Sequence, residues 1–85
     1  MESDCYSWRS NMGEVLIARN EERPSRWDLW ISGKRVCPAY YKSPDDAAFF
    51  ASRSDFGDEE LNEKYEQLRV PNDLQQWRVC KLSGA

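Results

Sequence analysis

The chain has 85 residues, of which 12 are Lys or Arg and 15 are Asp or Glu, so its formal net charge is −3. A chain of this length is expected to form a single domain over 1–85, and its 40% hydrophobic and 13% aromatic content excludes a disordered acidic chain. No segment approaches the ~20 apolar residues that cross a bilayer, and residues 1–4 lack the basic and apolar regions of a signal peptide, which predicts a cytoplasmic protein without membrane contact.

The first half of the chain is predicted to form antiparallel strands at 14–19, 26–31 and 35–41, with a further strand within 5–9 as an open alternative. Trp27, Leu29 and Ile31 fall on one face of the second strand, because side chains alternate across a strand. Gly33 is typical of a tight turn into the third strand, and Pro38 predicts that this strand lies at an edge or carries a bulge.

A first helix is predicted to begin after Ser43. Ser43 is a typical N-cap residue, Pro44 suits the first helical position, and Asp46 places an acid three residues after the cap. The side chains expected to face the sheet recur at i, i+3 and i+4 and are widened by two neighbours: Ala47, Phe50 and Ala51, with Ala48 and Phe49. The segment 55–57 is interpreted as a turn that ends this region.

A second helix is predicted to begin with the acids at 58–60, which suit the positive end of a helix dipole, and to end at Val70, just before a proline. Leu61, Tyr65 and Leu68 recur at i, i+4 and i+7 and form its predicted buried face. Alternation of polar and apolar residues then predicts a final strand over 76–82 that returns to the sheet.

The element order β-β-β-α-α-β predicts an α+β fold, in which two helices pack on one face of a small antiparallel sheet. The residues expected to fill most of the core come from the apolar faces of these elements: Trp27, Leu29, Ile31, Phe50, Leu61, Tyr65, Leu68 and Trp77. Residues 1–4 and 83–85 are expected to fray.

The chain lacks the residues of the commonest catalytic sites. It has no histidine, which excludes Ser-His-Asp and Cys-His chemistry and any His-ligated metal. Cys5, Cys37 and Cys80 are widely spaced and odd in number, which favours unpaired thiols in a reducing compartment, with Cys5 the most accessible. We therefore predict no catalytic residues, no metal, no cofactor and no small-molecule substrate.

Acidic residues are concentrated in one segment. Residues 45–66 carry eight acids and two bases, and Glu59, Glu63 and Glu66 fall at i, i+4 and i+7 of the predicted second helix. Like charges at this spacing cost a few tenths of a kcal/mol per pair, so the helix itself gains nothing from keeping them together. Two interpretations follow: a solubilising surface helix, or an acidic face that docks on a basic partner.

In general character the chain resembles phage anti-CRISPR proteins and nuclease immunity proteins, which are small and acidic on one side. The resemblance implies a non-catalytic inhibitor that mimics nucleic acid and occupies a basic surface of a nucleic-acid-handling complex. The candidate partner-binding residues are Asp55, Asp58, Glu59, Glu63 and Glu66. We expect the protein to be a monomer or a weak homodimer.

An alternative function is a small nucleic-acid-binding regulatory domain. Its candidate residues are Arg19, Arg26, Trp30 and Arg35, which place cations near an aromatic ring on the predicted sheet. A sheet of three strands followed by a helix resembles, in element order, the plant AP2-type and integrase-arm DNA-binding architectures. The sequence pI of about 4.9 opposes this alternative, because nucleic-acid affinity comes chiefly from phosphate neutralisation. An enzyme based on Asp or Glu chemistry is a third, weaker alternative.

Overall fold

A five-stranded antiparallel sheet, in the order β4-β3-β2-β1-β5, forms the centre of the computed structural model, which describes residues 5–36 and 40–80. The elements in chain order are β1 (Cys5–Ser10), β2 (Gly13–Arg19), β3 (Trp27–Ile31), β4 (Lys34–Arg35), α1 (Pro44–Ser52), α2 (Glu59–Lys64), a 3-10 helix η1 (Leu74–Gln76) and β5 (Arg78–Cys80). The predicted α+β class is confirmed. The segments expected to fray, 1–4 and 83–85, lie outside the described residues.

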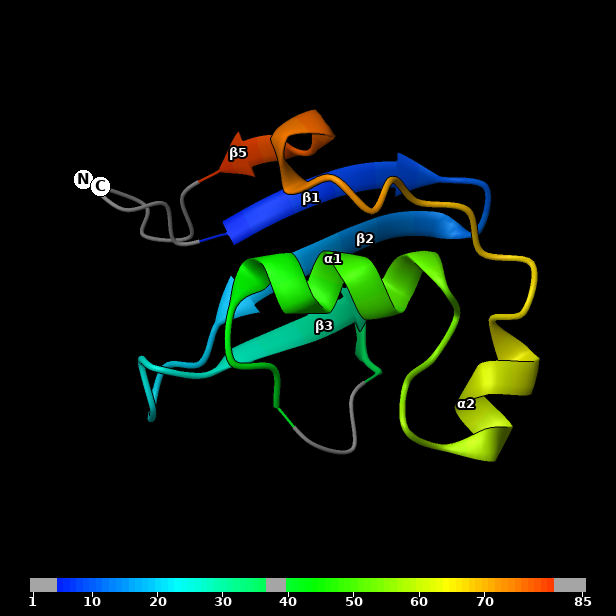
Figure 1. Ribbon diagram of the computed structural model, residues 1–85, viewed down its shortest axis with the longest axis horizontal. Helices are drawn as coiled ribbons and strands as arrows, with labels where there is room; N and C mark the ends of the chain where they lie inside the picture. Colours follow the sequence, from blue (N-terminus) through cyan, green and yellow to red (C-terminus); the bar gives the residue numbers. More distant parts are fainter. Residues whose placement is uncertain (1–4, 37–39, 81–85) are drawn as a thin grey trace.

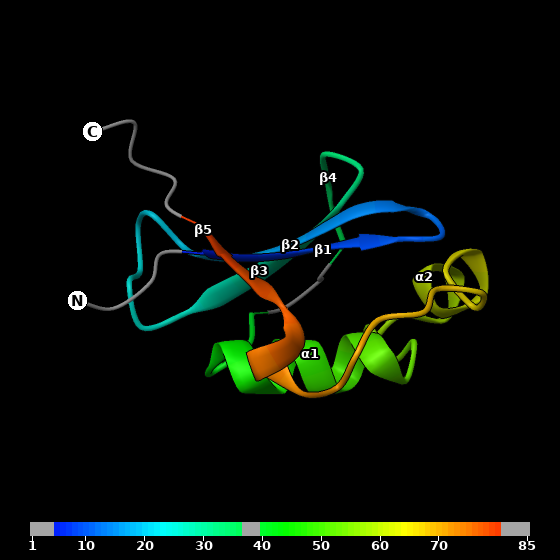
Figure 2. The same cartoon turned by 90° about the horizontal axis from the view of Figure 1, so that it is seen from above.

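One face of the sheet has no described helix packed on it. α1 runs across the other face with η1 beside it, and α2 lies at one end of the sheet rather than across it (Figures 1 and 2). We call the face opposite α1 the uncovered face. None of the described helices is long and apolar enough to cross a membrane.

The strand left open by the sequence is present as β1, which pairs with β2 through a two-residue turn. Gly13 closes this turn at φ +108°, a conformation that favours glycine, and its carbonyl accepts a hydrogen bond from Ser10 Oγ at 2.6 Å. The sheet therefore begins with β1, one strand before the first of the three strands predicted from the sequence.

The predicted strand at 35–41 is much shorter in the structure. β4 contains Lys34 and Arg35 alone, and Pro38 lies outside the described residues. Tyr41 then pairs with Trp27 through two backbone hydrogen bonds of 2.9 Å, so the chain returns to the edge of β3 before α1 begins. Of the predicted final strand over 76–82, residues 78–80 form β5, Gln76 ends η1 and Trp77 is the C-cap of η1, while residues 81–82 lie outside the described part.

The core lies between the sheet and α1. Trp27, Leu29 and Ile31 are buried as predicted, and so are Tyr65, Leu68 and Trp77. The register places the β3 side chains opposite buried residues of β2, Val15 and Ile17, which share the same face. Alternation along each strand therefore directs one apolar face toward α1.

The buried face of α1 differs from the predicted one. Ala47, Ala48 and Ala51 are fully buried, whereas Phe50 is half-buried and Phe49 is 43% exposed. Small side chains let the helix lie close to the sheet, and the phenylalanine rings then project at its sides. Phe50 stacks on Tyr41 there, with ring centroids 6.0 Å apart. The prediction that Phe50 belongs to the fully buried core is wrong.

The second helix is also shorter than predicted, because α2 ends at Lys64 and Tyr65 is its C-cap. Leu68 is buried although it follows the helix, while Leu61 is only partly buried. Phe56, in the segment interpreted as a turn, is buried and packs edge-on against Tyr65 at 5.8 Å between centroids.

Two of the three cysteines are paired, which overturns the prediction of unpaired thiols. β5 runs antiparallel to β1 in a register that sets Cys80 directly opposite Cys5, and the two form a disulfide. Cys5 is fully buried rather than accessible. Cys37 lies outside the described residues. The pairing is a consequence of strand order, which the spacing of the cysteines along the chain does not reveal.

Candidate functional site

The five predicted partner-binding acids lie on and beside α2. We call them the acidic surface: Asp55, Asp58, Glu59, Glu63 and Glu66. All five residues are exposed. α2 lies beyond the C-terminal end of α1, at the end of the sheet that carries the β1–β2 turn (Figures 1 and 2), so the acidic surface lies on a protrusion at that end rather than over the sheet.

Local hydrogen bonds determine where α2 starts and ends. Asp58 is the N-cap, and its Oδ1 accepts a hydrogen bond from Leu61 N at 3.1 Å. Glu59 and Glu63 are four residues apart within the helix and share a face. Glu66 lies in the turn after the helix, so the predicted continuous helical face of three glutamates contains only two of them.

Two side-chain hydrogen bonds hold this segment together, and two more tie it to the β1–β2 turn. Phe56 N donates to Asn62 Oδ1 at 2.7 Å, and Ser54 Oγ donates to the Tyr65 carbonyl at 3.0 Å. Asn11, in the turn between β1 and β2, donates through Nδ2 to the Gln67 carbonyl at 2.7 Å and accepts from Arg69 N at 3.0 Å. The acidic surface is therefore held in a defined position relative to the sheet.

The carboxylates of the acidic surface have little intramolecular neutralisation. Among residues 5–36 and 40–80, none of the five forms a salt bridge. The neighbouring cations contact aromatic rings: Lys64 Nζ lies 5.6 Å from the Tyr65 ring centroid, and the Arg53 guanidinium lies 5.3 Å from that of Phe49. Within the described residues, the five carboxylates therefore have no paired cation.

The four residues of the nucleic-acid alternative do not all share one surface. Arg19 donates to the Pro24 carbonyl at 2.6 Å and lies over the Trp27 ring, on the side of α1. Arg26 lies over Tyr40, at 3.8 Å from the ring centroid. Trp30 and Arg35 are directly opposite each other in the register and belong to the uncovered face. Arg19 nevertheless lines the same hollow as Trp30 and Arg35, so three of the four residues border one hollow, although the Arg19 guanidinium lies over Trp27.

The uncovered face also carries a buried charge that sequence reasoning missed. Asp28 is 6% exposed, and its Oδ1 lies 3.1 Å from Arg35 Nη2. Its other carboxylate oxygen accepts a hydrogen bond from Asn20 Nδ2 at 2.9 Å. The pair lines a shallow hollow of about 550 Å³ together with Trp30. The signal available in the sequence was the alternation of Asp28 with apolar residues, which places it on the face away from the core.

No metal centre is evident in the described part of the chain, where no group of three or more Cys, Asp or Glu side chains is arranged to hold an ion. Comparisons with protein-family models, with curated proteins and with solved structures found no match to this chain.

Proposed function

We propose that this protein is a non-catalytic interaction protein whose acidic surface binds a basic surface of a partner protein. The partner class we propose is a nucleic-acid-handling complex, in which the carboxylates take the place of nucleic-acid phosphates. This choice follows the resemblance of the sequence, in general character, to anti-CRISPR proteins and nuclease immunity proteins. The observation that carries the proposal is the set of five exposed acids without an intramolecular salt bridge in the described structure.

Two physical features support this choice. A protrusion with unneutralised carboxylates steers a basic partner and raises the association rate, an effect that falls as salt screens the charges. The side-chain hydrogen bonds that Asn11 and Ser54 donate and that Asn62 accepts hold the protrusion in one arrangement, so less conformational entropy is lost on binding.

The test is charge reversal on the acidic surface. The variant Glu59→Lys/Glu63→Lys/Glu66→Lys removes no buried side chain, because all three residues are exposed. Tagged wild-type protein is used to capture partners from a lysate at low and moderate salt, and the captured protein is then purified for binding measurements. We expect the triple variant to lose this partner while keeping a cooperative thermal transition.

A matched control separates a specific surface from a change in net charge. Glu21→Lys/Glu22→Lys/Asp45→Lys makes the same change in charge at exposed positions away from α2. The control should retain the partner, and the partner's own DNA or RNA should compete with the wild-type protein. Equal binding by wild type and the α2 variant would refute the proposal.

The nucleic-acid alternative predicts a different result from the same variants. Capture of RNA or DNA by the isolated protein, lost in Trp30→Ala/Arg35→Ala and strengthened in the α2 variant, would favour it. Trp30 and Arg35 support it as neighbours on the uncovered face, and the overall acidity opposes it.

The cytoplasmic location and a monomeric or weakly dimeric state belong to this proposal as predictions. Disulfides are rare in the reducing cytosol, so trapping of thiols in intact cells tests the location. A cytoplasmic protein should yield Cys5 and Cys80 largely reduced, and complete oxidation of both would contradict that location. Sedimentation at several concentrations tests the oligomeric state.

A further inference from the structure

β5 covers only the first half of β1. It pairs with Cys5, Tyr6 and Ser7, and the chain preceding it turns away from the sheet at Trp77. Trp77 N donates to the Leu74 carbonyl at 3.0 Å, and its indole N donates to the Pro71 carbonyl at 2.9 Å. Within the described structure, the second half of β1 therefore has a strand neighbour on the β2 side only.

The register shows which backbone groups this open edge presents. Ser32 N donates to the Glu14 carbonyl at 2.9 Å, so the backbone groups of Glu14 point toward β3. Glu14 is directly opposite Arg9. Two residues directly opposite each other in an antiparallel pair direct their backbone groups either both toward each other or both away from each other. The N–H and C=O of Arg9 consequently point away from β2, to the edge that β5 has left.

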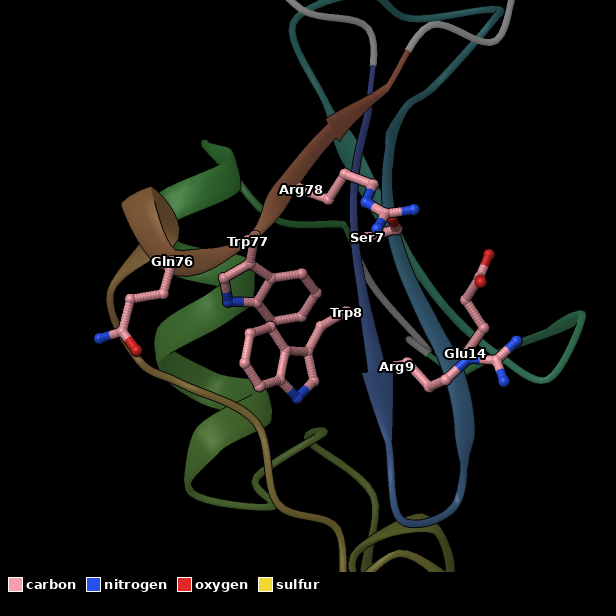
Figure 3. A pocket seen from close by; sticks show the side chains of 7 residues that line it. All are labelled: Ser7, Trp8, Arg9, Glu14, Gln76, Trp77 and Arg78. Atoms are coloured by element: carbon pink, nitrogen blue, oxygen red, sulfur yellow. The ribbon is translucent and has the colours of Figure 1, made fainter.

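A hollow of about 440 Å³ adjoins this edge (Figure 3). Its lining residues are Ser7, Trp8, Arg9, Glu14, Gln76, Trp77 and Arg78. Arg9 and Arg78 are exposed. Arg78 lies opposite Ser7, so both arginines belong to the uncovered face and are diagonal neighbours across β1 and β5. Trp8 and Trp77 supply apolar surface to the same hollow.

The charge of the hollow favours an anionic occupant. Glu14 is the one acid among its lining residues, and Arg9 and Arg78 are its two bases. Neither arginine forms a salt bridge with a described residue. An added strand that continues the line of β5 would place one residue directly opposite Arg9. The side chain of that residue would point to the uncovered face, beside both guanidinium groups, because residues opposite each other in a sheet share a face.

We propose that the open edge of β1 and the hollow beside it bind an extended peptide segment of a partner protein as an added β-strand along Trp8–Ser10, with an acidic side chain of the peptide between Arg9 and Arg78. Backbone hydrogen bonds to Arg9 supply the edge pairing, and the two guanidinium groups select the carboxylate. The peptide residues on either side of the acid point to the face that carries Trp8, which favours apolar side chains there. This site is separate from the acidic surface and stands whether or not that surface binds a partner.

The experiment uses defined probes with the oxidised, 15N-labelled full chain. One pool of capped pentapeptides has Glu at the centre and mixed Val, Ile, Leu and Thr elsewhere, and a second pool differs only in having Lys at the centre. We expect the Glu pool to shift the Arg9 amide resonance and to slow its hydrogen exchange. We expect the Lys pool to bind about tenfold or more weakly, since it exchanges a charge-assisted contact for a repulsive one.

Two matched changes separate the side-chain contribution from the backbone contribution. Arg9→Gln/Arg78→Gln should weaken the Glu pool about tenfold or more, whereas Arg23→Gln/Lys34→Gln, which removes the same charge at exposed positions elsewhere, should leave it unchanged. A Glu pool with N-methylated backbones should fail to bind, because it cannot donate to the Arg9 carbonyl. The Glu59→Lys/Glu63→Lys/Glu66→Lys variant should bind the peptides as wild type does.

Several results would overturn the proposal. These are equal affinity for the Glu and Lys pools, an Arg9 amide unaffected by the Glu pool, or undiminished binding of the N-methylated peptides. Shifts produced by inorganic phosphate but by neither peptide pool would also overturn it, because they indicate a simple anion site. If the protein self-associates through this edge, as sedimentation would detect, the occupant is a second copy of the chain, and the proposal of a partner peptide is rejected.

Discussion

Cys5 and Cys80 are 75 positions apart in the chain, yet they face each other across β1 and β5 with Cα atoms 5.2 Å apart and are joined by a disulfide. The bond lies between a fully buried residue of an inner strand and the last residue of a three-residue edge strand. Val79, in the middle of β5, is 59% exposed, so apolar burial does little to hold this strand. The disulfide is therefore a principal attachment of β5 to the sheet.

Removing the disulfide should lower stability substantially. In the chain-entropy description, closing a loop between residues 75 positions apart constrains the unfolded chain by an amount that corresponds to about 4–5 kcal/mol. Cys80→Ala or added reductant is expected to lower the melting temperature measured by circular dichroism, whereas Cys37→Ala should leave the reductant effect intact. An identical transition with and without reductant would show that β5 is held by other contacts.

The different burial of side chains on α1 and in the segment after α2 predicts how much stability each loses when it is replaced by alanine. Leu68→Ala should cost about 2–5 kcal/mol, because the side chain is fully buried and its removal leaves a cavity. Phe50→Ala should cost only about 1–2 kcal/mol, since the ring is half-buried at the side of α1. Phe49→Ala serves as the exposed control. Urea denaturation of the three variants checks this order, and a greater loss from Phe50 than from Leu68 would contradict the observed orientation of α1.

Gly13 and Gly33 both have positive φ, at +108° and +82°, but their surroundings differ. A Cβ at Gly13 would collide with Ser32 Oγ, whose hydrogen bond to the Met12 carbonyl is 3.0 Å long, whereas a Cβ at Gly33 would meet no atom within 4 Å. Gly33→Ala should therefore cost about 1 kcal/mol from backbone strain alone, and Gly13→Ala should cost more. Adding Ser32→Gly should recover part of the excess. Equal unfolding free energies for the two alanine variants would argue against this contact.

Asp58 has two separable roles, as the N-cap of α2 and as a charge on the acidic surface. Asp58→Ala should lower the unfolding free energy by about 1 kcal/mol, because it removes the acceptor for Leu61 N. Asp58→Asn keeps a capping oxygen and should leave stability nearly unchanged while removing the charge. If the acidic surface binds a basic partner, Asp58→Asn should slow association, most clearly at low salt. Stopped-flow measurement of the association rate tests this, and an unchanged rate would remove Asp58 from the binding surface.

The amino-acid sequence by itself determined those elements whose signals are local. Ser43 and Pro44 identified the start of α1, and alternation around Leu29 identified both β3 and its buried face. The concentration of acids around Glu59 was likewise readable, because charge is counted along the chain. In each case the relevant interactions join residues only a few positions apart, so the pattern and the structure coincide.

Only the tertiary structure decided which side chains meet across the sheet and which side chains of α1 are buried, because these depend on strand register and on the distance between the helix and the sheet. The order of the strands brought Cys80 to Cys5 and left Arg9 at an open edge. The close approach of α1 to the sheet selected its alanines for burial and displaced Phe50 to the side. Which arginines share a surface with Trp30 also followed from strand pairing, because a shift of one residue moves a side chain to the other face. These relationships join residues far apart in the chain, and local propensity carries no information about which distant segments will meet.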